Sequence, residues 1–312
     1  MAVLPPDPLF TLKGDMGYVH SMAFIPYEKD YTKSLFAATE TGYVYLWDLE
    51  SNRVNYKQQM GKSIQAIHCI DKKILIQEKS GALKSWIINE SSIYEVENEI
   101  DLYGGYCRSL IHEDNILIPI ERDMIAIFDL NFNKTASLKP TETDLGNVMC
   151  MECFKIKEND YLLTGYESGY LILFDITFRK QCSKLKLNEC VTSISYDEIT
   201  RRGVIGNASN ILHLIAIDQS LNLIVKAEIS MINDGCGIVK IRPDKKILVA
   251  GGWDGRLRLF SWKTLRVLVV LNEHKKAVTD VQFSPNVVDF WGSKVMAASS
   301  GDGTITLWNL YN

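Results

Sequence analysis

The sequence predicts an all-β protein, a single seven-bladed β-propeller that spans residues 1–312. One observation is a set of three short strands near the end of the chain. Val278–Phe283 and Thr304–Trp308 alternate apolar and polar residues, as a half-buried strand requires because successive side chains point to opposite faces. Val295–Ser300 is a run of small residues, and the turn Gly301-Asp302-Gly303 follows it.

The second observation is that this pattern recurs. An aromatic or large apolar residue ends a strand-like stretch at seven positions: Trp47, Trp86, Phe128, Phe174, Ile215, Phe260 and Trp308. The spacings between them are 39, 42, 46, 41, 45 and 48 residues. Propeller blades repeat every roughly 40–45 residues, so seven positions predict seven blades. A third observation is that no segment shows the 3.6-residue period of a helix.

The last repeat is similar to a WD40 blade. His274, Asp302 and Trp308 occupy the positions of the His, the turn Asp and the Trp of that motif, although Asn309 replaces the usual Asp after Trp. We expect these three residues to form a structural hydrogen-bond network. No other repeat holds such a complete set, because the sixth keeps Asp254 but has Phe260. The other blades are therefore expected to depend on apolar packing.

Each blade is expected to have four strands, and the seventh lacks one. The sequence ends at Tyr311-Asn312, directly after the third strand of that blade, which would leave an unpaired sheet edge. Phe10–Leu12 precedes the first blade and reads as a spare strand. We therefore expect this N-terminal strand to complete the last blade. In the third blade, the first strand is expected at Cys107–Ile111.

Composition limits the function classes. The chain has 312 residues and a formal net charge of −4, whereas nucleic-acid binding requires a basic surface. No apolar run approaches the roughly 20 residues of a membrane helix, and the N-terminus does not resemble a signal peptide. We therefore expect no direct nucleic-acid or membrane contact, and an intracellular protein. The seven scattered cysteines fit a reducing compartment as small buried residues.

No catalytic, cofactor or metal site is predicted. Gly61-Lys62-Ser63 resembles the end of a P-loop, but Tyr56 stands where the motif requires Gly. Cys150 and Cys153 form a C-x-x-C on an expected strand, where residues three apart point to opposite faces. The histidines show no metal-binding spacing. An enzyme whose catalytic residues assemble from several blades stays the most remote alternative.

Protein binding is the commonest function of a propeller. The turns between second and third strands should lie on one face. The outermost turn positions of blades one to six are Glu40, Lys79, Glu121, Glu167, Ala208 and Trp253. Tyr18 and Tyr106 precede first strands and should open on the same face, and Arg256 follows Trp253 closely. Aromatic residues and Arg dominate binding hot spots. The candidate partner-binding residues are therefore Tyr18, Glu40, Tyr106, Glu121, Glu167, Trp253 and Arg256. Trp253 could instead pack over the neighbouring blade.

Several stretches go beyond the generic repeat. They include PPDPLFTLKG at the start, GYCRS at 105–109, LTGYESGYLILFDI at 163–176, IRPDKKILVAGGWDGRLRLFSWKT at 241–264 and TLWNLY at the end. Together they resemble the family of guanine nucleotide-binding protein subunit beta-like protein 1, whose fungal relatives are called ASTRA-associated protein 1. The resemblance covers essentially the whole chain and is most specific at 241–264.

The resemblance implies a non-enzymatic scaffold in cytoplasm and nucleus. That family is associated with the maturation of phosphatidylinositol 3-kinase-related kinases, with the TTT co-chaperone complex, and in fungi with a chromatin-associated assembly. The expected partners are these co-chaperones and large kinases. Binding to Gγ is not expected, because three prolines among the first residues exclude the long N-terminal helix of a signalling Gβ subunit. A substrate receptor of a ubiquitin ligase or a chromatin-complex subunit is the alternative.

Overall fold

The computed structural model describes residues 5–28, 31–89, 91 and 93–311. Over these residues the strands form seven sheets. In most of them the strands run antiparallel and follow one another in chain order; the exceptions are the sheet that joins the two ends of the chain and a short parallel addition to the first sheet. This arrangement is the all-β seven-bladed propeller class that the repeat predicts. The described residues group into two compact units. None of the helices among these residues is both long and apolar enough to cross a membrane.

The first unit holds the first two repeats and the last two. Its first sheet contains β2 (Val19–Glu28), β3 (Tyr31–Thr39), β4 (Tyr43–Asp48) and β5 (Arg53–Gln59). The second contains β6 (Ile64–Ile70), β7 (Lys73–Glu78), β8 (Ala82–Ile88) and β9 (Tyr94–Asp101). From the sixth repeat come β23 (Ile247–Gly252), β24 (Leu257–Ser261) and β25 (Val267–Leu271). The last repeat provides β26 (Val278–Phe283), β28 (Met296–Ser300) and β29 (Thr304–Trp308).

The second unit holds the third, fourth and fifth repeats. The third contains β10 (Leu110–His112), β11 (Asn115–Pro119), β12 (Ile125–Asp129) and β13 (Lys134–Leu138). The fourth contains β14 (Val148–Ile156), β15 (Asn159–Tyr166), β16 (Tyr170–Asp175) and β17 (Lys180–Lys186). The fifth contains β18 (Val191–Asp197), β19 (Arg202–Asn207), β20 (Ile211–Ile217) and β21 (Leu223–Ser230). β22 (Cys236–Ile241), which opens the sixth repeat, belongs to this unit.

The recurring aromatic or apolar position has a common structural role. Its residues are buried, and in several blades it lies at a β-bulge between the third and fourth strands, as at Trp47, Phe174 and Phe260. A bulge bends a strand and increases its twist. The repeat therefore marks both a core residue and the point at which the outer strand curves.

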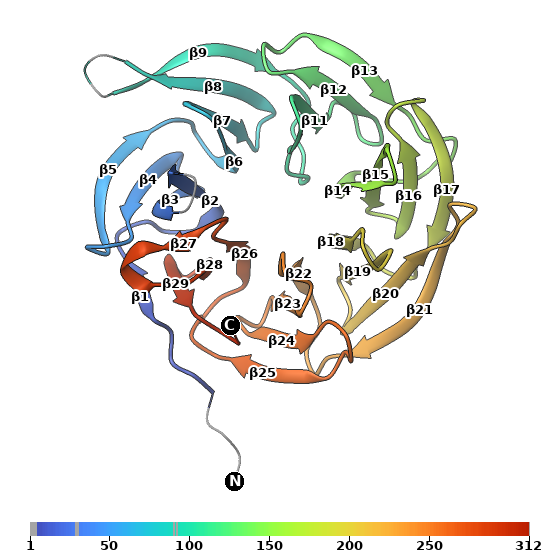
Figure 1. Ribbon diagram of the computed structural model, residues 1–312. Coiled ribbons are helices and arrows are strands. Elements are labelled where there is room, and N and C mark those ends of the chain that lie inside the picture. Colours follow the sequence, from blue (N-terminus) through green and yellow to red (C-terminus); the bar gives the residue numbers. More distant parts are fainter. Residues whose placement is uncertain (1–4, 29–30, 90, 92, 312) are drawn as a thin grey trace. The chain divides into compact units, whose positions relative to one another are not determined.

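The N-terminal strand completes the last blade, as predicted. β1 (Phe10–Lys13) pairs antiparallel with β29, with Phe10 opposite Leu307 and Lys13 opposite Thr304. Figure 1 shows these two ends of the chain side by side. Leu12 is 0% exposed and lies in the core cluster that also contains Trp47 and Ile305. The edge that the third strand of the last repeat would otherwise expose is thus paired.

The last blade carries an insertion that the sequence pattern did not predict. Between β26 and β28, β27 (Val287–Val288) pairs in parallel with β3 and adds a fifth strand to the first sheet. The 3₁₀ helix η1 (Asp289–Trp291) follows, and Trp291 packs against the core while Phe290 is 56% exposed. The region reads as a long loop because two strand residues are too few to show alternation.

The third repeat differs from the predicted strand limits. Its first strand, β10, begins at Leu110 rather than at Cys107, and Cys107 and Ser109 are buried without belonging to a strand. In the sequence, Cys107 reads as an apolar residue at the start of a strand-like stretch. The prediction that this strand spans Cys107–Ile111 was therefore wrong at both ends.

Candidate protein-binding rim

Four of the turns between second and third strands share one backbone geometry. Glycines at equivalent positions adopt positive φ, with values of 83° at Gly42, 91° at Gly169, 78° at Gly255 and 81° at Gly303. Each donates its N–H to the carbonyl three residues earlier, as Gly169 does to Tyr166 at 2.9 Å. At Gly255 a Cβ atom would lie 2.6 Å from the His274 carbonyl oxygen, so only glycine fits. These turns are fixed, and the residue two before each glycine is at the tip.

Five of the turns are bonded to the segment that precedes the first strand of the same blade. The Glu40 N–H donates to the Tyr18 carbonyl at 2.9 Å, and the Glu167 N–H donates to the Asn147 carbonyl at 2.9 Å. The same bond joins Lys79 to Ser63, Ala208 to Cys190 and Gly301 to Ala277. Tyr18 and Glu40 therefore lie side by side at one edge of the first blade. The Tyr18 ring also packs close to Gly301 of the last blade.

Trp253 projects from a turn that is held by a buried ion pair. The Asp254 carboxylate accepts two bonds from the Arg258 guanidinium, at 3.1 and 2.7 Å, and one from the Arg256 N–H at 3.2 Å. Burial opposes ionisation of Asp254, but these bonds outweigh it and lower its pKa. Trp253 itself is 48% exposed, and Arg256 is exposed beside it. The turn thus presents a large aromatic surface on a rigid base.

Glu121 and Glu167 lie together in the second unit. Both line an open hollow of about 730 Å³, together with Tyr103, Asp123 and Asp144. The Glu167 carboxylate accepts bonds from the Asn147 backbone N–H at 3.0 Å and from its side-chain amide at 2.7 Å. These bonds hold the pKa of Glu167 below its usual range. We call this surface the acidic hollow. Tyr106 does not line it, although Tyr106 is 62% exposed.

Three residues of the acidic hollow were missed by sequence reasoning. Asp123 follows the outermost turn position of the third blade, and Tyr103 and Asp144 lie in the linkers between blades. A comparison of equivalent turn positions therefore did not select them. Tyr103 donates its hydroxyl to the Asn147 side chain at 3.1 Å. Asp144 adopts a positive φ of 58°, a local conformation that Asp tolerates better than most residues. The spacing of turns carries no information about the linkers between blades.

The candidate residues divide between the two units. Tyr18, Glu40, Trp253 and Arg256 belong to the first unit, and Tyr106, Glu121 and Glu167 belong to the second. Within its unit, Tyr18 adjoins Glu40, Arg256 adjoins Trp253, and Glu121 shares a hollow with Glu167.

His274, Asp302 and Trp308 are connected through two threonines. His274 Nδ1 lies 3.5 Å from an Asp302 carboxylate oxygen and 3.2 Å from Thr304 Oγ1. Its Nε2 lies 3.0 Å from Thr306 Oγ1, which also accepts the Trp308 indole N–H at 2.8 Å. Burial lowers the pKa of His274, against the opposing effect of Asp302. Thr306 was missed because alternation in Thr304–Trp308 marks it only as a polar strand position.

The cysteines show no shared site for a metal. Cys150 packs against the apolar cluster of Val191 and Leu171, whereas Cys153 packs against that of Leu117 and Leu162. The two thiols of the C-x-x-C therefore point to different clusters, as expected on one strand. Burial raises the pKa of the Cys69 thiol to about 12 and raises that of Cys153 as well. Such thiols stay protonated at neutral pH, which makes them poor metal ligands and nucleophiles.

Among the described residues, His112, Glu113 and Asp160 could approach one cation together. His112 Nε2 lies 2.8 Å from an Asp160 carboxylate oxygen. The Lys155 ammonium already lies 2.6 Å from Glu113 and 3.8 Å from Asp160. A lysine thus supplies the positive charge that these carboxylates attract, and the cluster is explained as a surface ion-pair network.

Comparison with known proteins agrees with this fold. Residues 234–261 and 265–309 match the family described as WD domain, G-beta repeat. These two segments fall in the sixth and seventh repeats of the propeller. The chain is 29% identical over 325 residues to guanine nucleotide-binding protein subunit beta-like protein 1 of Mus musculus, a match that covers 98% of this chain and 97% of the relative.

Fungal proteins show the same relationship. ASTRA-associated protein 1 of Schizosaccharomyces japonicus is 21% identical over 377 residues, covering 98% of this chain and 99% of the relative. The protein of that name from Schizosaccharomyces pombe is 44% identical over 73 residues, 23% of this chain and 18% of the relative. The chain is thus similar along nearly its full length to guanine nucleotide-binding protein subunit beta-like protein 1 and to ASTRA-associated protein 1.

Proposed function

We propose that this protein is a non-enzymatic scaffold that binds protein partners and supports the assembly of phosphatidylinositol 3-kinase-related kinases together with the TTT co-chaperone complex. Similarity along nearly the full chain to guanine nucleotide-binding protein subunit beta-like protein 1 and ASTRA-associated protein 1 carries the proposal. The kinase and co-chaperone association is what the family resemblance implies. Cytoplasm and nucleus are the compartments in which such a role would be performed.

The candidate residues at the turns and at the segments beside them, which we call the rim, support a binding role. Trp253 offers a large exposed ring on a turn fixed by Asp254 and Arg258, so little conformational entropy would be lost on contact. Tyr106 offers a second exposed aromatic surface, and Glu121 and Glu167 offer negative charge. Large aromatic residues beside charged ones are the composition of binding hot spots. Tyr18, Glu40 and Arg256 complete the proposed contact set.

The proposed partners can be identified by affinity purification of the tagged full chain from cells, followed by mass spectrometry. We expect peptides of the large kinases and of the TTT subunits, enriched over a tag-only control. Cullin adaptors would instead indicate a ubiquitin-ligase receptor, and histones or other chromatin proteins would indicate a chromatin-complex subunit. Either outcome, without kinases or co-chaperones, would contradict the proposal.

A further inference from the structure

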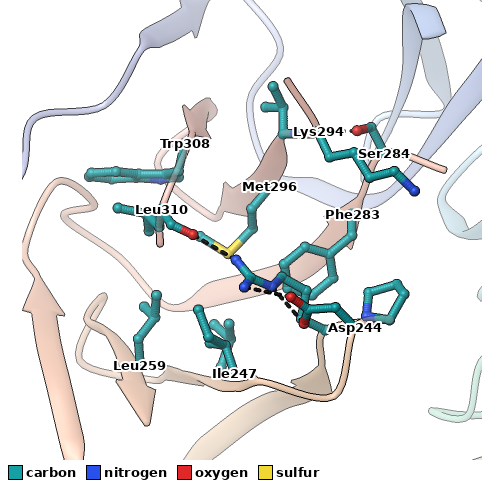
Figure 2. Close-up of a pocket in the computed structure, with 13 residues that line it drawn as sticks. Asp244, Ile247, Leu259, Phe283, Ser284, Lys294, Met296, Trp308 and Leu310 are labelled. Atoms are coloured by element: carbon teal, nitrogen blue, oxygen red, sulfur yellow. Dashed lines mark hydrogen bonds and ion pairs between the residues drawn. The ribbon is translucent and has the colours of Figure 1, made fainter. Parts of the chain in front are cut away.

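The first unit contains an apolar pocket at the loops that join first to second strands in the sixth and seventh repeats. One loop spans residues 242–246 and the other spans residues 284–295. The cavity measures about 110 Å³. Figure 2 shows Ile247 and Leu259 along one side and Trp308, Met296 and Leu310 facing them. Val249, Phe283 and Val295 also line it, and Arg242, Asp244, Ser284 and Lys294 contribute polar groups. We call it the loop pocket.

Hydrogen bonds hold the wall of the loop pocket in place. The Arg242 guanidinium donates to the Leu310 carbonyl at 2.6 Å and to the Tyr311 carbonyl at 3.0 Å, and it pairs with Asp244 at 2.7 Å. On the other loop, the Val295 N–H donates to Ser284 Oγ at 2.9 Å. The pocket is therefore formed before any ligand arrives, so binding would not have to order it.

The polar groups around the loop pocket are mainly basic. Residues 242–246 contain Arg242, Lys245 and Lys246 but only one acid, Asp244, and Lys294 adds a further positive charge from the second loop. The second loop also contains Asp289, so four cations stand against two carboxylates and the two loops carry a net charge of +2, although the whole chain carries −4. Charge of one sign around an apolar recess selects a ligand of the opposite sign and speeds its approach.

We propose that the loop pocket binds an extended acidic segment of a protein partner and seats one apolar side chain from it. An engineered apolar cavity of roughly 150 Å³ accommodates benzene, so about 110 Å³ suits one aliphatic side chain such as leucine. Carboxylates beside that side chain would meet Lys294 and the cations of the first loop. Burial of that leucine side chain would strengthen binding at least about tenfold.

This surface is separate from the rim. The loops before β23 and β28 lie at the opposite strand ends from the turns after them, where Trp253 and Asp302 lie. The inference goes beyond the proposed function and holds whether or not the large kinases are partners. A partner could therefore contact the rim while a second segment occupies the loop pocket.

A synthetic peptide tests the proposal with the full-length protein. The probe is a fluorescein-labelled nonapeptide with a central leucine and two glutamates on each side of it, and its fluorescence anisotropy is measured at low salt. We expect saturable binding below about 1 mM. Replacing the central leucine by alanine should weaken binding at least about tenfold, and replacing the glutamates by lysines should abolish it. No binding at about 1 mM would overturn the proposal.

Two variants localise the binding, each with a check on folding. Met296→Phe adds bulk inside the loop pocket without changing charge, and Lys294→Glu reverses charge at the exposed mouth. Both should weaken the leucine probe at least about tenfold while circular dichroism and melting stay near wild type. Lys226→Glu, an equal charge change on exposed β21, should leave binding unchanged. Equal affinity for the leucine and alanine probes, or undiminished binding by Met296→Phe, would show that the loop pocket is not the binding site.

Discussion

At the residue scale, the tryptophans of the repeat are not equivalent. The Trp308 indole N–H donates to Thr306 Oγ1 at 2.8 Å. Among the described residues, the indole N–H groups of Trp47 and Trp86 are buried without a hydrogen-bond partner. Three other blades carry Phe at this position, namely Phe128, Phe174 and Phe260. Six of the seven blades therefore place a large ring at this position and the fifth places Ile215, but only the last blade uses the polar group of tryptophan.

This difference predicts unequal effects of the same substitution. Trp47→Phe and Trp308→Phe remove the same volume from a buried site, but only the second breaks a hydrogen bond and leaves Thr306 with one partner fewer. We expect Trp308→Phe to lower the free energy of unfolding by about 1–2 kcal/mol more than Trp47→Phe. Urea denaturation of both variants measures this difference. Equal losses would show that the network in the last blade contributes nothing.

His274 predicts a pH dependence of stability. Burial lowers its pKa in the folded state, so the unfolded chain binds this proton more readily. The folded state is therefore fully favoured above the ordinary pKa near 6.5 and loses stability as pH falls from there toward the folded pKa. Asp302 also has a lowered pKa, but its contribution is lost only in more acidic solution.

The matching experiment compares melting temperatures at about pH 7 and about pH 5.5 in the wild type and in His274→Gln. We expect the variant to be less stable at the higher pH but to lose less on acidification. His213 also has a pKa lowered by burial, so His213→Gln reports how much of the wild-type slope arises elsewhere. A slope unchanged in His274→Gln would exclude His274 as its source.

At the element scale, the N-terminal strand is part of the last blade. β1 pairs with β29 along four residues and buries Leu12, so its loss would expose a sheet edge and remove a core side chain. We expect deletion of residues 1–13 to lower the melting temperature by at least about 5 °C. Deletion of residues 1–8, which keeps Leu9 and its bond to the Leu307 carbonyl, is the control and should melt near wild type. Similar melts for both deletions would contradict this role.

The sequence predicted this closure but not the insertion at 285–294, and the physical reason differs between them. Phe10–Leu12 was recognisable because the last blade lacked one strand, so the repeat itself required a partner. β27 adds to a sheet that is already complete, and no count of strands demands it. The first strand of the third blade was misplaced because Cys107 is buried outside a strand. Repeats thus predict shared elements, whereas departures from the repeat depend on contacts between segments distant in sequence.

The candidate rim residues were likewise predictable only where they follow the repeat. Turn positions such as Trp253 and Glu167 could be selected because each blade places them equivalently, and they lie at fixed turns. Tyr103 and Asp144 belong to linkers, which vary between blades, so only the structure groups them with Glu121. The loop pocket was likewise hidden, because its wall depends on Arg242 meeting the carbonyl of Leu310.

At the scale of the whole molecule, the chain is a seven-bladed propeller for which the proposed function is protein binding. The buried thiols of Cys107 and Cys153 have raised pKa values. The Lys155 ammonium pairs with Glu113 in the cluster that also contains Asp160. Exposed aromatic side chains such as Trp253 and Tyr106 are the groups available for contact with a partner. Two relatives are similar to the chain along nearly its full length. Partner binding is therefore the property to measure.

Quantitative affinity purification of wild type, Trp253→Ala and Phe178→Ala tests that claim most directly. Phe178 is a comparably exposed aromatic residue outside the rim and serves as the matched control. Because aromatic hot spots contribute roughly 2 kcal/mol or more, Trp253→Ala should reduce recovery of the kinase and co-chaperone partners at least about tenfold. Phe178→Ala should retain them, and both variants should melt like wild type. Full recovery of partners by Trp253→Ala would contradict binding at the rim.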